Sequence, residues 1–586
     1  MENMIGQDGG GSINFMSLGS SNQSLWDGYN NHVYKLHLIL ERASLTVGIP
    51  VNNEKRLTLK DDLEKELAIL DAELQKLVPI EVRDLHPRRK DKVTGNVEYG
   101  FKRQFKEIVF LISSYQLAIE KVLEKNPDAK VLSPAEFIYK KLGLVTWYDE
   151  LLDKYNWCKV KPFKPSSQQI IRYLEFVIEK LEISGTKEDK KLAKLYKIPV
   201  NFKTKKKTSG KKELEELLEK TGDEVLKNVQ EYRSIKYNLS NSIPNWKPDD
   251  NGFVHTTWGF TAPTGQLDSR SPNILNCSKH TKIGKIFRKI VESPKGYCFV
   301  EFDFKSFHVG LMGFRANDKT YIRFSQLDPH SIYCSHIIRD DNNVTPLIPH
   351  LVDWSDDEIM KVCKYIKTNY KSVRQEQAKP TVLGNQLGLG PFKLQHQNRK
   401  YIPTVARAKE LQSIIKTEFP KVERAKAEII ERAFVQGYLI NEFGRIQYFY
   451  DVFNFSFDKK TGKWEKKHGT DTEKVLAFAV QSPAFGMIHS KLLELEEEGI
   501  EKNGESWLDR FNFNNSIHDQ VAFMPRIEDR DLCLEIVGRK LQEPCRWLVN
   551  DATGPGGLQI GVDASWGLNW QDKGEGNEYG MEDVKI

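Results

Sequence analysis

The sequence lacks any arrangement of cysteines that would hold a fold together. Its seven cysteines are scattered, odd in number and never spaced as CxxC pairs. This pattern predicts free thiols in a reducing compartment and argues against a disulfide framework or a structural zinc site. The chain also lacks an apolar run long enough to span a membrane, and it has no basic-then-apolar signal peptide. These absences predict a soluble globular protein.

The charge has little overall bias, but positive residues are clustered. The 87 Lys and Arg residues outnumber the 81 Asp and Glu residues by only six. Basic stretches such as HPRRKDK (86–92) and FKTKKKTSGKK (202–212) would suit a polyanion, although such runs are also typical of solvated surface loops. At 586 residues the chain is expected to form several subdomains.

The chain changes character near residue 250. Residues 1–24 are rich in Gly, Ser and Asn and are predicted to be flexible. Apolar residues at three- and four-residue spacing then predict helices over 57–78, 105–123 and 213–239. Beyond 250, strand patterns appear at 252–276, 296–314, 513–524 and 558–563, with helices between about 320 and 440. The pattern predicts a helix-rich α+β protein.

Two apolar strand candidates each carry an acid where the strand ends. In CFVEFDFKSF the acid is Asp303, and in NSIHDQVAF it is Asp519. An unpaired carboxylate beside buried apolar residues is costly, so each acid needs a partner. On neighbouring strands of one sheet the two carboxylates could share divalent cations, as phosphoryl-transfer sites require. The alternative is that each aspartate only caps a strand end or lies in a turn.

The order of further segments resembles the polymerase region of the family A DNA polymerases, the DNA polymerase I type. The matching segments run in the family's order from about 250 to 570: TGQLDSRSPNILN (264–276), VEFDFKSFHVG (300–310, similar to motif A), AKPTVLGNQLGLG (378–390, similar to motif B), the run from Phe419 to Phe449, AVQSPAFGMIHSKLLEL (479–495), SIHDQVAF (516–523, similar to motif C) and LQIGVDASWGLNW (558–570). Weaker similarity reaches back to the family's helical thumb.

The resemblance implies a right-hand polymerase fold around an antiparallel-sheet palm. Its expected parts are a flexible segment 1–29, a helical thumb region 30–250, palm pieces 251–320 and 475–586, and helical fingers 321–474. The implied activity is template-directed addition of deoxynucleotides to a primer 3′ end in DNA replication, with release of pyrophosphate. The implied partners are primer-template DNA and dNTPs. A monomer in the cytoplasm of a bacterial or phage-infected cell is expected.

The resemblance also assigns roles to individual residues. Asp303, Asp519 and the backbone carbonyl of Phe304 would bind two Mg²⁺ ions. Lys379 would meet the triphosphate and could protonate the departing pyrophosphate. The residues expected to contact DNA are Thr264, Gln266, Asn273, Asn276, Arg445 and His518. Three alternatives stay open. Lys379 could be a solvent-exposed lysine without a ligand, His518 could only cap the hairpin, and Arg445 could form a structural salt bridge.

Several residues depart from the family pattern near the nucleotide. His308 stands where the family has a glutamate that crowds the ribose 2′ position, and it could act by bulk or by accepting a hydrogen bond. Leu383 and Leu387 replace two aromatic residues, so ring stacking on the incoming base is lost. In the surrounding segments Gln266 replaces an arginine and Phe485 replaces a glutamine. These departures point to a divergent, phage-like lineage.

The helix before Lys379 departs in its spacing. The family's arginine is expected four residues before the lysine, where this chain has Gln375, and Arg374 comes one position earlier. One residue is roughly 100° around a helix, so either the helix shifts locally or Lys371 or Arg374 reaches the phosphates by another route. Pro380 directly after the lysine favours a kink.

The thumb-like sequence begins by about residue 30, which leaves no room for the 3′–5′ exonuclease domain that many family members carry. Proofreading is therefore expected to come from a separate exonuclease, and a processivity factor is a possible further partner. Two other functions stay open. One is a primase-like or RNA-synthesising relative with relaxed sugar selectivity, and the other is an inactive protein that only binds nucleic acid.

Overall fold

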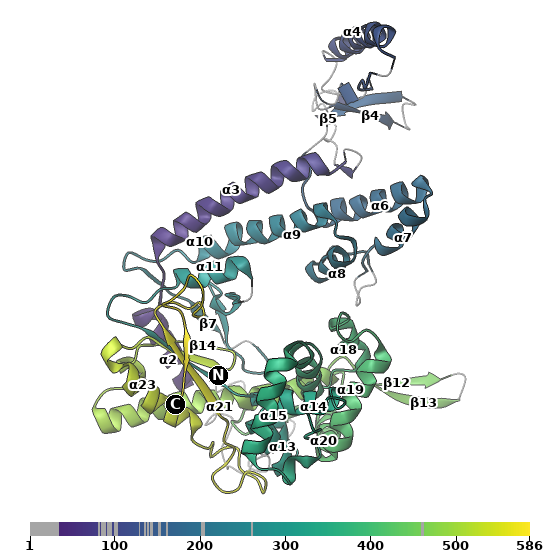
Figure 1. The fold of residues 1–586 in the computed structure, drawn as a ribbon. Helices are drawn as coiled ribbons and strands as arrows, with labels where there is room; N and C mark the ends of the chain where they lie inside the picture. The colour runs from purple at the N-terminus through teal and green to yellow at the C-terminus, as the bar shows by residue number, and fades with distance from the viewer. Residues whose placement is uncertain are drawn as a thin grey trace, which may run out of the picture. The chain divides into compact units, whose positions relative to one another are not determined.

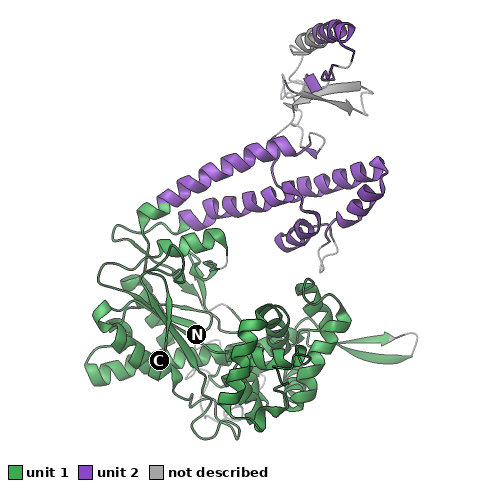
Figure 2. Cartoon of the chain, viewed as in Figure 1, with its two compact units in different colours: residues 1–56, 245–586 green, residues 57–244 purple. Residues whose placement is uncertain are grey.

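The computed structural model describes residues 34–79, 82–83, 89–90, 97–98, 104–127, 129–133, 136–137, 140, 144–149, 154–159, 162–200, 206–259, 262–279, 281–458 and 462–586. The predicted flexible segment 1–29 lies outside these residues. The chain divides into two compact units, residues 1–56 with 245–586 and residues 57–244 (Figure 2). Each unit is described separately.

The unit of residues 57–244 is mainly helical. Its helices are α3 (Asn53–Leu77), α4 (Gln104–Lys125), α6 (Ser167–Ser184), α7 (Lys187–Leu195), α8 (Lys211–Thr221) and α9 (Glu224–Tyr237). Two short strand pairs, β2 (Arg89–Lys90) with β3 (Val97–Glu98) and β4 (Leu144–Asp149) with β5 (Lys154–Lys159), interrupt the helices. These strands were not predicted from the sequence.

The helix predicted over 213–239 is broken in two, and the break has a local cause. Gly222 adopts a left-handed conformation (φ 64°) that ends α8. Asp223 then caps α9, because its carboxylate accepts a hydrogen bond from the N–H of Leu226 at 2.9 Å. The hydroxyls of Tyr173 and Tyr196 donate to the same carboxylate at 2.8 and 2.6 Å. The cap therefore also holds α6 and the end of α7 against α9.

The unit that contains the candidate site is built on a five-stranded antiparallel sheet. Its strand order is β14-β15-β9-β16-β17. The strands are β9 (Phe299–Phe304), β14 (Phe513–Ile517), β15 (Gln520–Phe523), β16 (Val562–Gly567) and β17 (Glu582–Val584). The strand predicted over 558–563 therefore starts later, at Val562. The central strand β9 is buried at every position except Asp303.

Helices of the same unit pack on this sheet and on one another (Figure 1). They are α2 (Lys35–Arg42), α11 (Lys282–Ile290), α12 (Phe307–Arg315), α13 (Lys319–Gln326), α14 (Pro329–Ile337), α15 (Asp356–Asn369), α16 (Lys371–Val373), α17 (Lys379–Gln386), α18 (Pro391–Gln397), α19 (Val405–Glu418), α20 (Pro420–Gln436), α21 (Thr472–Asn503), α22 (Trp507–Arg510) and α23 (Arg530–Gln542). The short α10 (Ile243–Asn245) lies where the chain passes from the helical unit into this one. Helix α23 packs against β9 and β16, while α12 packs against α17 and α21. The sheet core includes Phe299, Phe302 and Trp570, all fully buried.

The region predicted as the helical fingers, 321–474, also contains two β-hairpins, both of which lie largely beyond the helices expected up to about residue 440. The first joins β10 (Tyr438–Ile440) to β11 (Ile446–Tyr448), and the second joins β12 (Phe453–Asp458) to β13 (Lys463–His468). The second had a signal in the sequence, because FNFSF alternates aromatic and polar residues before the turn-forming DKKTG. No strands were predicted there from the sequence.

Residues 49–56, which the sequence placed in the thumb region 30–250, pack with the unit that contains the sheet. Strand β1 (Ile49–Pro50) pairs with β6 (Phe253–Val254), so residues up to 56 belong to the unit with the sheet. The helical unit accordingly begins at residue 57, whereas the sequence placed its start near 30. A further short pair joins β7 (Thr257–Gly259) to β8 (Asp268–Arg270). Within the described parts of the chain, no helix combines the length and apolar character needed to cross a membrane.

Candidate active site

The two aspartates predicted to act together lie on adjacent strands of the sheet. Asp303 is the fifth residue of β9, and Asp519 directly precedes β15, whose first residue Gln520 is paired with Asp303. The N–H of Phe304 donates a hydrogen bond to the carbonyl oxygen of Asp519 at 3.1 Å. The main chain therefore fixes the two aspartates side by side, although 215 residues separate them in the sequence.

The surroundings of Asp303 disfavour its negative charge. Its side chain reaches solvent at the edge of the sheet, yet the protein around it excludes enough water to raise its pKa to about 7. The charge of Asp519 adds to this rise, and Asp563, paired with Asp303 on β16, contributes in the same direction. The positive charge of Lys279 offsets this rise in part, and a bound cation would relieve the remaining repulsion.

The donor set at this edge suits a hard divalent cation. Among the described residues, no three His, Cys, Asp or Glu side chains converge as a ready-made metal site. Mg²⁺, however, is commonly held by one or two carboxylates together with water and substrate phosphates, so Asp303 and Asp519 are sufficient protein ligands. The third nearby carboxylate, Asp563, is instead paired with Lys305 at 2.6 Å.

Both aspartates are flanked by residues in a left-handed backbone conformation. Ser306, three residues after Asp303, has φ 47°, and His518, directly before Asp519, has φ 56°. Non-glycine residues rarely adopt this conformation, and they cluster at functional sites where the surrounding structure enforces it. At the β14–β15 connection, His518 allows a tight turn that presents Asp519 at the sheet edge.

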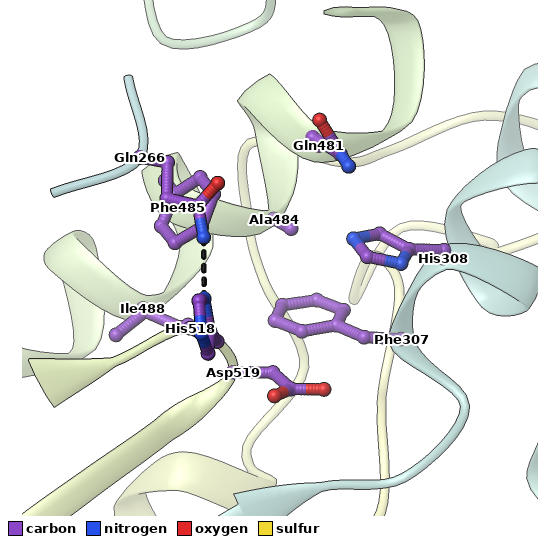
Figure 3. Close-up of a pocket in the computed structure, with 9 residues that line it drawn as sticks. All are labelled: Gln266, Phe307, His308, Gln481, Ala484, Phe485, Ile488, His518 and Asp519. Carbon is purple, nitrogen blue, oxygen red and sulfur yellow. Dashed lines mark hydrogen bonds between the residues drawn. The ribbon is translucent and has the colours of Figure 1, made fainter. Parts of the chain in front are cut away.

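A pocket of about 190 Å³ lies beside Asp519 (Figure 3). Its lining residues are Gln266, Phe307, His308, Gln481, Ala484, Phe485, Ile488, His518 and Asp519. The side-chain amide nitrogen of Gln266 lies 2.5 Å from Nδ1 of His518. Because an amide nitrogen only donates, Nδ1 of His518 is the acceptor in this contact. Gln266 therefore orients the His518 ring within the pocket.

His308 enters the same pocket from the first turn of α12. Burial lowers the pKa of its imidazole, and the nearby charge of Asp519 only partly offsets this effect. His308 is accordingly neutral near pH 7. A neutral imidazole has both a hydrogen-bond donor and an acceptor, so this position combines bulk with polar character.

The helix that carries Lys379 contains a wide turn that corrects its spacing. Residues Arg374–Ala378 form a π-helical turn between α16 and α17, in which the N–H of Lys379 bonds to the carbonyl of Arg374, five residues earlier. This extra residue brings Arg374 onto the face of Lys379. The turn also precedes Pro380, whose ring would clash with the carbonyl of Glu376 in a regular α-helix. The local shift considered from the sequence is therefore present.

Arg374 is held by an ion pair beneath the start of α14. Its Nη2 lies 2.9 Å from Oδ1 of Asp328, and its Nε donates to the Ser331 hydroxyl at 2.8 Å. His330 lies in the same cluster, where the positive charges of Arg374 and Lys379 act on its ring. Its Nδ1 is buried and has no hydrogen-bond partner among the described residues. This histidine was missed in the sequence analysis, because a lone histidine in a helix carries no signal of its own.

The two leucines that replace family aromatics follow Lys379 at intervals of one helical turn. Leu383 lies four residues after the lysine and Leu387 eight residues after it, and both side chains are half-buried. They therefore extend the face of Lys379 with aliphatic surface.

The predicted DNA-contacting residues fall into two groups. Thr264 and Gln266 flank Gly265, which has φ 83° and lies so close to Arg445 that a Cβ on it would be 2.5 Å from the guanidinium Nε. Arg445 therefore packs on this turn, and burial lowers the pKa of its guanidinium.

Asn273 and Asn276 lie on the short 3₁₀ turn Ile274–Asn276, outside the residues that line the pocket. The side-chain oxygen of Asn273 accepts from the N–H of Leu275 at 3.1 Å and so holds that turn.

The buried His330 is expected to make the folded protein less stable at acidic pH. Burial lowers the pKa of its imidazole from 6.5 to about 4, so the unfolded chain binds a proton there more readily than the folded chain. Stability from this residue is therefore lost as the pH falls from about 6.5 toward 4, by up to about 1.4 kcal/mol per pH unit. We expect the melting temperature of His330→Gln to fall less between pH 7 and pH 5 than that of the wild type. Equal falls would contradict the burial of a neutral imidazole.

A model of the family described as DNA polymerase family A matches residues 168–572 of the chain. The chain therefore belongs to the family A DNA polymerases and is a DNA-directed DNA polymerase, which confirms the family predicted from the motifs.

Among solved structures, it is similar to the POL domain of Pol1 from M. smegmatis in complex with DNA primer-template and dNTP. The TM-score is 0.54 at 15% identity, over 92% of this chain and 70% of that chain. This likeness confirms the predicted α+β fold class. No curated protein sequence matches the chain.

Proposed function

We propose that this polymerase extends the 3′ end of a DNA primer along a template, with Asp303 and Asp519 as the ligands of two Mg²⁺ ions. The observation that supports this most directly is the pair of aspartates fixed on adjacent strands by the Phe304–Asp519 main-chain hydrogen bond. The similar Pol1 domain binds primer-template DNA and dNTP, which are the partners proposed for this chain.

The two aspartates and the backbone carbonyl of Phe304 would hold the ions. When bound, divalent ions neutralise charge on the attacking and leaving oxygens of phosphoryl transfer. The protein supplies their position: the sheet fixes Asp303, and the turn at His518 fixes Asp519. Both carboxylates must be ionised to bind a cation, and a bound cation would offset the burial and the repulsion by Asp519 that together raise the pKa of Asp303.

The face of the helix containing Lys379 would bind the triphosphate. Lys379 is exposed at the start of α17, and the π-helical turn places Arg374 on the same face. His330 adds a buried imidazole whose Nδ1 has no partner in the described structure. We assign these three residues to the phosphates, with Lys379 also delivering a proton to the departing pyrophosphate. Leu383 and Leu387 would contact the base.

The remaining residues would position the duplex. His518 is oriented by Gln266 and faces the pocket beside Asp519, a place suited to the primer's terminal nucleotide. Arg445 and Thr264 meet at the Gly265 turn, and Asn273 and Asn276 follow on the neighbouring 3₁₀ turn. We propose that these groups contact the minor groove and backbone of the duplex.

Primer extension tests this function directly. A primed DNA template, Mg²⁺ and either dNTPs or rNTPs are supplied in separate reactions. Extension with dNTPs alone supports the proposal. Comparable extension with rNTPs would instead favour the RNA-synthesising alternative, for which the neutral His308 is the supporting observation. Tight binding of primed DNA without extension would contradict both.

His308 is expected to set the sugar preference. Truncating it in His308→Ala opens the pocket beside Asp519, and we expect ribonucleotide incorporation relative to deoxynucleotide incorporation to rise about tenfold or more. His308→Gln keeps most of the bulk and should retain the wild-type ratio. The measurement is the ratio of kcat/KM for a dNTP and the matching rNTP. An unchanged ratio in His308→Ala would show that another group excludes the 2′-hydroxyl.

A further inference from the structure

The hairpin formed by β12 and β13 has one aromatic face. Residues directly opposite each other in antiparallel strands lie on the same face, and every second residue returns to it. The register pairs Phe453 with His468, Phe455 with Lys466 and Phe457 with Trp464. All six are therefore on one face, whereas the residues between them are polar or charged.

Most of this aromatic face is open to solvent. Phe455 is 54% exposed, Phe457 50% and Trp464 69%, and the face continues onto α20 through Phe434, whose ring centroid is 6.1 Å from that of Phe455. Figure 1 shows the hairpin extending away from α19 and α20. Exposed aromatic clusters of this kind mark interaction sites, because apolar surface in contact with water is unfavourable and a partner that covers it removes that cost.

The base of the hairpin is fixed to the helix. Lys466 lies 3.8 Å above the ring of Phe453 and pairs with Glu431 of α20 at 2.8 Å. The ring of Phe453 also packs edge-on against Phe434 at 5.2 Å. The outer rings are thus presented by a hairpin whose root is anchored, so little ordering is needed when a partner binds.

The positive charge of the hairpin indicates a negatively charged partner. The stretch 453–468 contains five lysines against one aspartate and one glutamate, a net charge of +3. Lys466 lies on the aromatic face, while Lys463 and Lys467 lie on the opposite face of the same hairpin. Lysines close to exposed rings are the combination that binds single-stranded nucleic acid, because the charge attracts the backbone and the rings stack on the bases. Same-face positions along a strand are about 6.7 Å apart, about twice the base-to-base rise of 3.4 Å. One base would therefore fit between successive rings.

We propose that the β12–β13 hairpin binds single-stranded DNA by stacking its bases on Phe455, Phe457 and Trp464. In the context of the proposed function, this DNA is the unpaired stretch of the template strand. The inference rests on that function only for the identity of the strand. Binding itself requires no primer, nucleotide or metal and can be measured separately from polymerisation.

The test is the affinity of the full chain for a fluorescently labelled oligo(dT) of twelve nucleotides, followed by anisotropy at low salt. We expect the triple variant Phe455→Ala/Phe457→Ala/Trp464→Ala to bind at least about tenfold more weakly than wild type. Trp464→Phe keeps a ring and should stay within about threefold. Tyr450→Ala is the matched control, because Tyr450 is 90% exposed but lies outside the hairpin. Thermal melting should not differ among the variants, since the rings removed are exposed.

Two further measurements separate this proposal from the polymerase function. The triple variant should extend a primer normally on a template with a two-nucleotide overhang and less efficiently on one with a long overhang. Asp519→Asn should lose extension on both and keep its oligo(dT) affinity. Wild-type affinity in the triple variant, or no binding by the wild type, would overturn the proposal. The proposal would also be overturned if wild type self-associated in sedimentation experiments and the triple variant did not, because the aromatic face would then join two copies of the chain.

Discussion

Asp519→Asn is expected to reduce primer extension at least about 1,000-fold. The substitution removes one of the two carboxylates proposed to hold the cations, and metal stabilisation of phosphoryl transfer contributes several kcal/mol to the transition state. The side chain keeps its size, and the turn at His518 and the hydrogen bond from Phe304 involve only the main chain. The measurement is the single-turnover rate of nucleotide addition to a primer in Mg²⁺.

The stability of the same variant distinguishes a catalytic loss from a folding loss. Asp519 raises the pKa of Asp303 by repulsion, so its neutral replacement should leave the melting temperature unchanged or slightly higher. Asp531→Asn removes the same charge from an exposed position 80% accessible to solvent and should retain wild-type extension. Near-wild-type extension by Asp519→Asn would show that this aspartate is a turn residue, the alternative considered from the sequence.

Lys379→Gln is expected to lower kcat about 100-fold or more, with less effect on KM. A positive charge beside phosphates that gain negative charge during the reaction stabilises the transition state more than the bound substrate. Loss of one such group typically lowers kcat by about this factor. The measurement is steady-state incorporation of one dNTP on primed DNA.

Lys371→Gln is the matched control for this helix. Lys371 lies on the same helical segment and is also exposed. The main-chain hydrogen bonds from Arg374 to Tyr370 and from Lys379 to Arg374 align Tyr370, Arg374 and Lys379 along one face of the helix, and Lys371 lies on a different face. We expect Lys371→Gln to retain most of the wild-type rate. A loss equal to that of Lys379→Gln would mean that the segment acts as a general basic surface.

The elements that could be predicted from the sequence are those whose patterns are local. The buried strand before Asp303 and the hairpin around Asp519 are both short apolar runs interrupted by one acid. The order of the matching family motifs along the chain then suggested that the two aspartates lie close together. The register that makes Gln520 the partner of Asp303 depends on pairing between distant segments. It could be anticipated only as a neighbouring-strand arrangement.

What the sequence did not reveal depends on three-dimensional context. The spacing of Arg374 and the position of Pro380 indicated that the helix before Lys379 could shift, but not that it does so through a π-helical turn. The position of His330 beside Arg374 depends on how α14 packs against that helix. The β12–β13 hairpin did have an alternating pattern, but the helical character of its neighbours outweighed it. The displaced start of β16 reflects a bridge between Cys545 and Leu558 that takes the preceding residues out of the sheet.

The π-helical turn at Arg374–Ala378 also changes how this chain compares with its relatives. A turn of this kind accommodates one inserted residue without rotating the helix that follows, so Leu383 and Leu387 keep the same orientation relative to Lys379. A gap-free comparison sets Gln375 against the family's arginine and suggests that a charge has been lost. With one insertion allowed in this turn, Arg374 is set against the family's arginine instead, and in this structure its guanidinium binds Asp328 and Ser331. The π-helical turn therefore places on the face of Lys379 a cationic residue that a gap-free comparison overlooks.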